Sequence, residues 1–367
     1  MRQRVLHLVQ GLGLGGTEKV ACLLACGLLR NGRFETAVWS PQDGPRAAAL
    51  RENGVTLFLG GDAATALLRF APHIAHLHRA GWPQPELMRQ VRAGLRFLPD
   101  GTRLPRIVET NVFGRHDPSP GGKLIDCTLF VSHFCARRFA VVENRQVAMP
   151  RYGVLYNPVD TAFLGSHCLA PERRDYARPV LGRISRPDKG KWSRLALDML
   201  PHLARLRPDF RCDVVGGIPE AEDFVRARGL ESHVRFLAPV HGEGELAAFL
   251  DELSVLAHAN DTGESFGLVI AEAMAAGLPV VTHPCAGLKD NAQLELVEHG
   301  VTGLVAENAE DYAAAVAWLF AHPEEARRMG RAGREKACRL YAVDVVVRRL
   351  EAVYDALLSG EHEYDAS

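Results

Sequence analysis

Short runs of hydrophobic residues along the chain are separated by longer segments in which apolar positions recur at helical spacing. The runs are bounded by Gly, Pro or Asn, which is typical of buried β-strands. Before residue 158 we predict seven strands, with helices between several of them. Their residues are 4–10, 36–40, 55–60, 73–78, 106–110, 127–132 and 152–157. Strands that alternate with helices predict a mostly parallel sheet covered on both faces.

This rhythm is lost in residues 158–178, which we interpret as a linker, and then it restarts. Six further strands are predicted, at residues 179–185, 212–217, 234–240, 253–259, 278–283 and 302–306. Helical patterns follow at 191–206, 267–276, 309–320, 323–338 and about 343–359. We therefore predict two successive α/β domains with a cleft between them. In such open sheets ligands bind outside the carboxyl ends of the strands.

Composition and charge narrow the function. The chain has 367 residues and a formal net charge of −1, so a general affinity for nucleic acid is not expected. Residues 1–160 carry 20 Lys and Arg against 12 Asp and Glu, whereas residues 161–367 carry 23 against 32, which suggests two domains with different partners. Eight scattered Cys without a C-x-x-C pair are expected to be reduced thiols in a cytoplasmic protein.

No apolar run approaches the roughly 20 residues that a membrane-spanning helix needs. The basic start of the chain leads into an apolar segment that is too short for a signal peptide and is followed at once by glycines. We expect this segment to be the first strand.

Two acidic residues, Glu264 and Glu272, flank the start of the helix predicted at 267–276. Its free N–H groups suit a phosphate or another anionic oxygen, and the second carboxylate lies roughly 8 Å further along at 1.5 Å per residue. Carboxylates accept hydrogen bonds from sugar hydroxyls. The pattern therefore fits a nucleotide sugar, whose diphosphate lies between two sugars. The alternative is a capping Glu264 and an exposed Glu272.

A second candidate element is the loop after the strand at 179–185, where Arg183 and Lys189 suit a diphosphate, Arg186 being a weaker candidate. The alternative is a solvated basic loop. In the first domain, Gly15 and Gly16 would let backbone approach a ligand closely. The glycines also fit a dinucleotide fingerprint, but the second strand lacks the acid that this motif requires.

Six segments in sequence resemble the retaining glycosyltransferases of family 4. The segment ESFGLVIAEAMAAGLPVV resembles the E-x7-E motif of that family, and it is the most specific of the six. The others are GLGLGGTE, HIAHLH, VLYNPVD, LGRISRPDKG and VEHGVTGLV. They cover nearly the whole chain in the order of the family.

The resemblance implies an α/β fold of the GT-B type, with two Rossmann-like domains whose parallel sheets face a cleft. Residues 1–160 would bind the acceptor and residues 175–340 the nucleotide-sugar donor. Residues 341–367 would form a C-terminal helix that crosses back to the first domain. The family needs no metal or other cofactor, and no Asp-x-Asp pair follows a strand in this chain.

The resemblance also implies roles for individual residues. The catalytic residues would be His78, which contacts the transferred sugar, Glu264, which holds its hydroxyls, and the diphosphate-binding pair Arg183 and Lys189. We expect His76 to point away from His78. The remaining donor-binding residues would be Gly15, Gly16, Ser265, Phe266, Gly267, Leu268 and the ribose-binding Glu272.

The chain departs from the family pattern in three places, one of which is Ala238 in RFLAPV, where Gly is common. The family strand often ends in His where this chain has VETNVFGRHD, so Asn111 or His116 would mark a different acceptor site. The loop CAGLKDNAQLE differs from the usual G-G-x-P-E, so Gly287, Leu288 and Lys289 would line the donor phosphates by position only.

The implied function is retaining transfer of a sugar from a nucleotide-diphosphate sugar to a saccharide, lipid-linked or small-molecule acceptor in bacterial glycan or glycoconjugate synthesis. The alternative is a sugar-nucleotide-binding protein or a GT-B epimerase without transfer activity. Residues 86–99 form a basic amphipathic pattern, with Arg89, Arg92 and Arg96 on one face. Such a helix suits peripheral contact with an anionic membrane, and the alternative is an ordinary surface helix.

Overall fold

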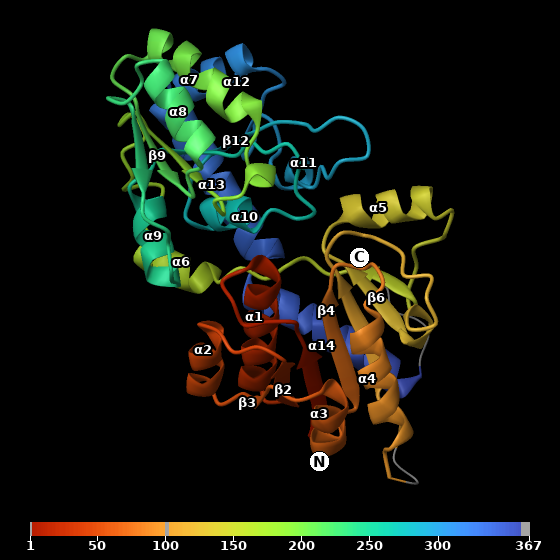
Figure 1. The fold of residues 1–367 in the computed structure, drawn as a ribbon. Coiled ribbons are helices and arrows are strands. Elements are labelled where there is room, and N and C mark those ends of the chain that lie inside the picture. The colour runs from red at the N-terminus through yellow and green to blue at the C-terminus, as the bar shows by residue number, and fades with distance from the viewer. Residues whose placement is uncertain (1, 100–102, 361–367) are drawn as a thin grey trace. The chain divides into compact units, whose positions relative to one another are not determined.

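The computed structural model describes residues 2–99 and 103–360, which fold into two α/β units (Figure 1). The first unit comprises the residues up to Pro158 together with those from Val343 onward, and the second comprises Val159–Ala342. The predicted C-terminal segment 341–367 therefore begins in the second unit and belongs to the first unit from Val343 onward. Its residues 361–367 lie outside the described part of the chain.

The first unit is built on a seven-stranded parallel sheet in the order β3-β2-β1-β4-β5-β6-β7. Its strands are β1 (Gln3–Leu8), β2 (Phe34–Ser40), β3 (Thr56–Leu59), β4 (Ile74–Arg79), β5 (Arg106–Asn111), β6 (Cys127–Phe130) and β7 (Tyr152–Val154). Its helices are α1 (Gly16–Asn31), α2 (Arg46–Glu52), α3 (Ala63–Phe70), α4 (Pro85–Arg96), η1 (Gly122–Leu124), α5 (His133–Val142) and α14 (Val343–Ser359).

The two faces of this sheet are covered by different helices. Leu6 and Leu77 point into an apolar core that includes α3 and α4. α14 packs against α1, where a Cβ at Gly27 would lie 2.6 Å from Val347 Cγ2. The absence of a side chain at Gly27 therefore lets the C-terminal helix approach α1 closely.

The strand order indicates where the first unit would bind a ligand. The chain builds the sheet outward from β1 in one direction through β2 and β3, and in the other direction from β4 to β7. The carboxyl ends of β1 and β4 are thus the point at which the winding reverses, where open α/β sheets bind ligands.

The second unit is built on a six-stranded parallel sheet in the order β10-β9-β8-β11-β12-β13. Its strands are β8 (Val180–Ile184), β9 (Arg211–Val215), β10 (Val234–Leu237), β11 (Val255–Ala257), β12 (Val280–Thr282) and β13 (Gly303–Val305). Its helices are α6 (Thr161–His167), η2 (Lys189–Lys191), α7 (Arg194–Leu206), α8 (Pro219–Ala227), α9 (Glu243–Asp251), α10 (Leu268–Ala275), α11 (Gln293–Leu296), α12 (Ala309–Ala321) and α13 (Pro323–Leu340).

These two sheets confirm the predicted fold class of two parallel-sheet α/β units. The interpretation of residues 158–178 as a linker was wrong in part, because the segment contains α6 and is anchored on the second unit. The side chain of Asp160 caps α6 by accepting a hydrogen bond from Phe163 N at 2.9 Å. The buried guanidinium of Arg174 donates to the backbone carbonyls of Leu250, Asp251, Leu253 and Ala276. Polar anchoring of this kind leaves no hydrophobic periodicity in the sequence.

Candidate functional site

A largely buried carboxylate, Glu264, lies in the loop between β11 and α10. Three side chains donate hydrogen bonds to its Oε1 atom: Asn260 Nδ2 at 2.7 Å, Lys191 Nζ at 3.0 Å and His258 Nε2 at 3.2 Å. The backbone is fixed as well, since Glu264 N donates to Gln293 Oε1 at 3.0 Å. The carboxylate is therefore held in one position before any ligand binds.

The charge of Glu264 is set by these neighbours. Burial alone would raise the pKa of its carboxyl, but the hydrogen bonds and electrostatic interactions with His258 and Lys191 outweigh burial and lower the pKa to about 2. The side chain is thus an anion at neutral pH.

The two carboxylate oxygens of Glu264 differ in their hydrogen bonding. The three side-chain hydrogen bonds all end on Oε1, and among the described residues no hydrogen bond to Oε2 is recorded. The side chain retains 17% exposure. An ionised oxygen with open lone pairs is a strong acceptor for a hydroxyl group.

The helix that follows Glu264 presents its N-terminus to the same loop. Gly267 ends the loop in the left-handed region at φ 100°, a conformation that favours glycine, and Leu268 is the first helical residue. The first turn contains no acidic side chain to offset the positive end of the helix. Ser265 and Phe266 are buried beside it, and Glu272 is buried on the helix with 4% exposure.

Arg183 is more deeply buried than a solvated basic loop would allow, with 6% exposure. Its guanidinium donates to the backbone carbonyl of Ala259 at 2.8 Å and to that of Lys191, and lies 4.3 Å from the ring centroid of Trp192. Burial lowers its pKa to about 10. Arg183 therefore ties β8 to the loop after β11 and to η2, which contributes Lys191, and its contact with a diphosphate stays a prediction.

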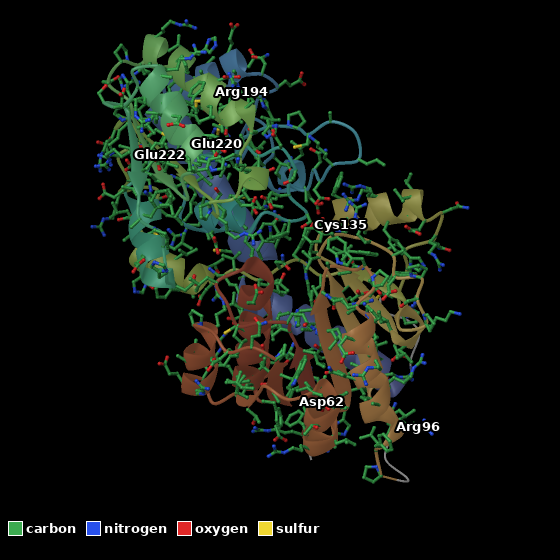
Figure 2. All side chains as sticks on the ribbon, in the orientation of Figure 1. Asp62, Arg96, Cys135, Arg194, Glu220 and Glu222 are labelled. Atoms are coloured by element: carbon green, nitrogen blue, oxygen red, sulfur yellow. The ribbon has the colours of Figure 1, made fainter. Side chains whose placement is uncertain are left out.

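Lys189 lies on the surface, with 79% side-chain exposure, and pairs with Glu220. Glu220 lies at the start of α8 (Figure 2). The lysine that contacts Glu264 is Lys191, two residues further along η2. The donor-binding role of Lys189 also stays a prediction, and Lys191 joins it as a cation of the same loop.

The predicted residues Gly15, Gly16, Asn111 and His116 lie in the first unit. Gly15 caps α1 and Gly16 is its first residue, and a Cβ at Gly15 would lie 2.2 Å from the carboxylate of Glu18. Asn111 uses its side chain within its own loop, since Nδ2 donates to Arg115 O at 2.8 Å and Oδ1 accepts from Arg115 N at 3.2 Å. His116 contacts Phe139 edge to face.

His78 is buried near the end of β4 with 2% exposure. The expectation that His76 points away from it was wrong. β4 stays regular from Ile74 to Arg79, so positions 76 and 78 share one face, and the two rings stack with centroids 4.5 Å apart.

Sequence reasoning missed several polar residues that the fold brings to these sites. His258, Asn260 and Gln293 contact Glu264. Their only sequence signal is that His258 lies near the end of the strand predicted at 253–259 and that Asn260 follows this strand directly. In the first unit, Arg79 is buried between two carboxylates: Nε donates to Glu109 at 2.7 Å and Nη1 to Asp117 at 2.8 Å.

Among residues 2–99 and 103–360, no helix is long and apolar enough to cross a bilayer.

Comparison with known proteins shows that the chain is similar to glycosyltransferases. Residues 178–322 match the family model "Glycosyl transferases group 1". The chain is 34% identical over 200 residues to the phosphatidyl-myo-inositol mannosyltransferase of Mycobacterium leprae, covering 52% of this chain and 50% of that protein. It is 32% identical over 231 residues to a GDP-mannose-dependent alpha-(1-6)-phosphatidylinositol monomannoside mannosyltransferase of Mycolicibacterium smegmatis, covering 59% and 58%. The chain thus spans little more than half the length of these relatives.

Among solved structures, a glycosyltransferase from Rickettsia africae aligns with a TM-score of 0.77 at 15% identity, over 98% of this chain and 99% of that chain. This likeness confirms the GT-B fold that the sequence resemblance implies.

Proposed function

Because residues 178–322 form a glycosyl transferases group 1 domain, we propose that this protein is a glycosyltransferase. It moves a sugar from a nucleotide-diphosphate sugar to a saccharide, lipid-linked or small-molecule acceptor in bacterial glycan or glycoconjugate synthesis. The observation that carries the proposal is Glu264, an ionised carboxylate with one oxygen fully hydrogen-bonded and the other open, beside the start of α10.

In the proposed mechanism Glu264 Oε2 accepts hydrogen bonds from hydroxyls of the transferred sugar. Asn260, His258 and Lys191 hold Oε1, so the carboxylate does not reorganise when the donor binds. Glu272 holds the ribose hydroxyls of the nucleotide. The proposal gives each of the two acids a different part of the same elongated ligand.

The diphosphate is the leaving group, and its negative charge grows as the glycosidic bond breaks. The N–H groups at the start of α10 stabilise this charge together with Arg183 of β8 and with Lys189 and Lys191 of η2. We propose retention of anomeric configuration. The departing phosphate takes the acceptor proton on the same face of an oxocarbenium-like sugar, and no metal takes part.

Two of the similar proteins carry names that refer to mannose, and the name of one states that it depends on GDP-mannose. GDP-mannose is therefore the first donor to test. The same names include phosphatidylinositol acceptors, which favours a lipid-linked acceptor over a soluble one.

The peripheral membrane contact is proposed for α4. Its buried residues Leu87 and Val91 face the core, and Arg89 and Arg92 are exposed on another side. Arg89 pairs with Glu86 at 2.7 Å, which offsets part of the positive charge. Phe97, directly after the helix, is 68% exposed and adds an apolar side chain to this surface.

A thermal-shift screen tests donor binding. A ligand that binds only the folded protein raises the unfolding temperature, so GDP-mannose, UDP-glucose and other nucleotide sugars are compared with the free nucleotides. We expect one nucleotide sugar to stabilise the wild-type protein and to stabilise Glu264→Gln less. A panel in which no nucleotide or nucleotide sugar shifts the transition would overturn the proposal.

A further inference from the structure

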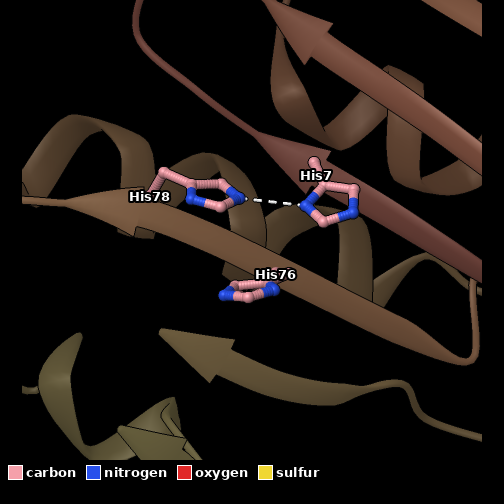
Figure 3. A group of neighbouring side chains, drawn as sticks. All are labelled: His7, His76 and His78. Atoms are coloured by element: carbon pink, nitrogen blue, oxygen red, sulfur yellow. Dashed lines mark hydrogen bonds between the residues drawn. The ribbon is translucent and has the colours of Figure 1, made fainter. Parts of the chain in front are cut away.

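His7 forms a buried pair with His78 at the carboxyl ends of two adjacent strands. His7 is the residue before the end of β1, and His78 is the residue before the end of β4. His7 Nδ1 lies 2.9 Å from His78 Nε2, and the two rings are inclined by 25° (Figure 3). This distance is that of a hydrogen bond, so one of the two nitrogens carries a proton.

The third ring of the cluster, His76, is occupied by other partners. Its Nδ1 lies 2.6 Å from the hydroxyl of Tyr354 on α14, and its Nε2 lies 2.8 Å from the hydroxyl of Thr110 on β5. The three histidines offer ring nitrogens within 4.8 Å of one another, a spacing compatible with a metal ion. Because both nitrogens of His76 bind hydroxyl groups, the geometry favours a hydrogen-bonded chain over metal ligation.

All three rings are neutral at neutral pH. Burial lowers the pKa of His7 to about 3. Burial also lowers the pKa of His76 and of His78 well below the ordinary value. Repulsion from a neighbouring histidine in its protonated form lowers both pKa values further. A neutral imidazole has one N–H and one acceptor nitrogen, so the His7–His78 bond decides where the proton of each ring lies.

Two nitrogens of the pair lack a protein partner within the described chain, His7 Nε2 and His78 Nδ1. If His7 Nδ1–H donates to His78 Nε2, the proton of His78 lies on Nδ1. The unpaired nitrogen of His7, Nε2, is then an acceptor without a proton. The opposite assignment leaves an unpaired N–H on His7, which has no exposed surface. Both assignments leave one N–H and one acceptor nitrogen unpaired within the protein, but only His78 stands at the position predicted to meet a ligand, which would pair its N–H.

We propose that His7 is a positioning residue that fixes the tautomer of His78. His7 Nδ1–H donates to His78 Nε2 and leaves His78 with its proton on Nδ1, as a hydrogen-bond donor to the oxygen of a bound sugar. The stacked ring of His76, held by Tyr354 and Thr110, keeps His78 in this plane. This inference rests on the proposed function both for its ligand and for the choice between the two tautomers, whereas the tautomer itself is measured without any ligand.

Nitrogen-15 NMR of histidine-labelled protein tests the tautomer directly, because protonated and unprotonated ring nitrogens of a neutral imidazole resonate apart. The His78 signals are assigned from their loss in His78→Gln. We expect the wild type to show the Nδ1-protonated form of His78. The proposal would be overturned if the wild-type protein showed the opposite tautomer, or if its ring signals changed with EDTA or added Zn²⁺. This test needs no variant of His7.

Two variants separate positioning from packing. In His7→Asn the amide nitrogen takes the place of Nδ1 and still donates, so the His78 tautomer is expected to persist. In His7→Leu the donor is lost, and the His78 signals are expected to average between tautomers. An unchanged His78 spectrum in a folded His7→Leu would contradict the inference.

Transfer assays add the functional readout. His7→Leu should lower kcat by about tenfold to a hundredfold, the usual effect of losing a partner that orients an imidazole, with little change in the KM of the donor, and His7→Asn should restore most of it. Equal loss in both variants would assign His7 to packing alone. If no sugar is transferred but the NMR result holds, the proposed function fails and the tautomer assignment stands.

Discussion

The histidine cluster makes the stability of the first unit depend on pH. His7, His76 and His78 are almost fully buried, and burial holds their pKa values below 6.5, the ordinary value that applies to the unfolded chain. Below that pH the unfolded chain binds protons that the folded unit does not bind. The free energy of unfolding therefore falls as the pH falls through 6.5 and continues to fall toward the folded pKa values.

The magnitude follows from linkage. For one histidine that stays neutral in the fold, lowering the pH from about 7 to about 5.5 costs about 1.2 kcal/mol, and three such residues cost about 4 kcal/mol. His7→Asn removes one of the three. The groups that face the cluster from β5 and α14 are the hydroxyls of Thr110 and Tyr354, and burial raises the pKa of Tyr354 well above its ordinary value. The wild type should therefore lose about 1.2 kcal/mol more than the variant over this range.

Urea unfolding at the two pH values measures this difference. Each sample receives the same brief deuterium pulse at a single pH, and peptides from β1 and β4 report the unfolding of the first unit by mass spectrometry. His133→Asn, which removes an exposed imidazole from the same unit, is the matched control. A stability difference between wild type and His7→Asn that does not change with pH would refute the reasoning.

Three further predictions concern the proposed donor site and membrane contact. Arg183→Ala or Lys189→Ala should lower transfer by about a hundredfold or more, since a lost charge-stabilising donor costs on the order of 3 kcal/mol; near-normal turnover in both variants would reject the diphosphate assignment. Transfer should persist in EDTA, and a strict requirement for Mn²⁺ or Mg²⁺ would contradict the metal-free mechanism. The protein should bind anionic vesicles at low salt. Changing Arg89, Arg92 and Arg96 to Ser should abolish cosedimentation, because each Arg near an anionic surface contributes about 1 kcal/mol of binding free energy. Equal binding to neutral vesicles would reject α4 as a membrane-binding surface.

The fold and the location of the acidic pair could be predicted from sequence because they depend on local patterns. Alternating strands and helices determine a parallel α/β sheet, and Gly267 with Gly277 bounds α10 through their positive φ angles of 100° and 82°. The position of Glu264 ahead of that helix follows from the same local signals.

The contacts of the site could not be predicted, because they join residues far apart in the sequence. Lys191 reaches Glu264 from a loop 73 residues earlier, and His7 reaches His78 across 71 residues. The orientation of His76 was predicted wrongly because the strand was assumed to be irregular. Its hydrogen bond to Tyr354 could not be predicted, because Tyr354 lies on a helix 278 residues away in the sequence. Polar partners of this kind leave no periodic signal in the sequence.

The most direct test of the central claim is a transfer assay that compares wild type with Glu264→Gln. Release of nucleoside diphosphate and formation of glycoside are followed with GDP-mannose and the other donors of the panel, and proton NMR reads the anomer of the product. Glu231→Gln, which neutralises an exposed acid of the same unit, is the control. We predict a retained anomer in wild type and in Glu231→Gln, and a loss of about a hundredfold or more in Glu264→Gln. Wild-type transfer rates in Glu264→Gln, or an inverted product, would contradict the account.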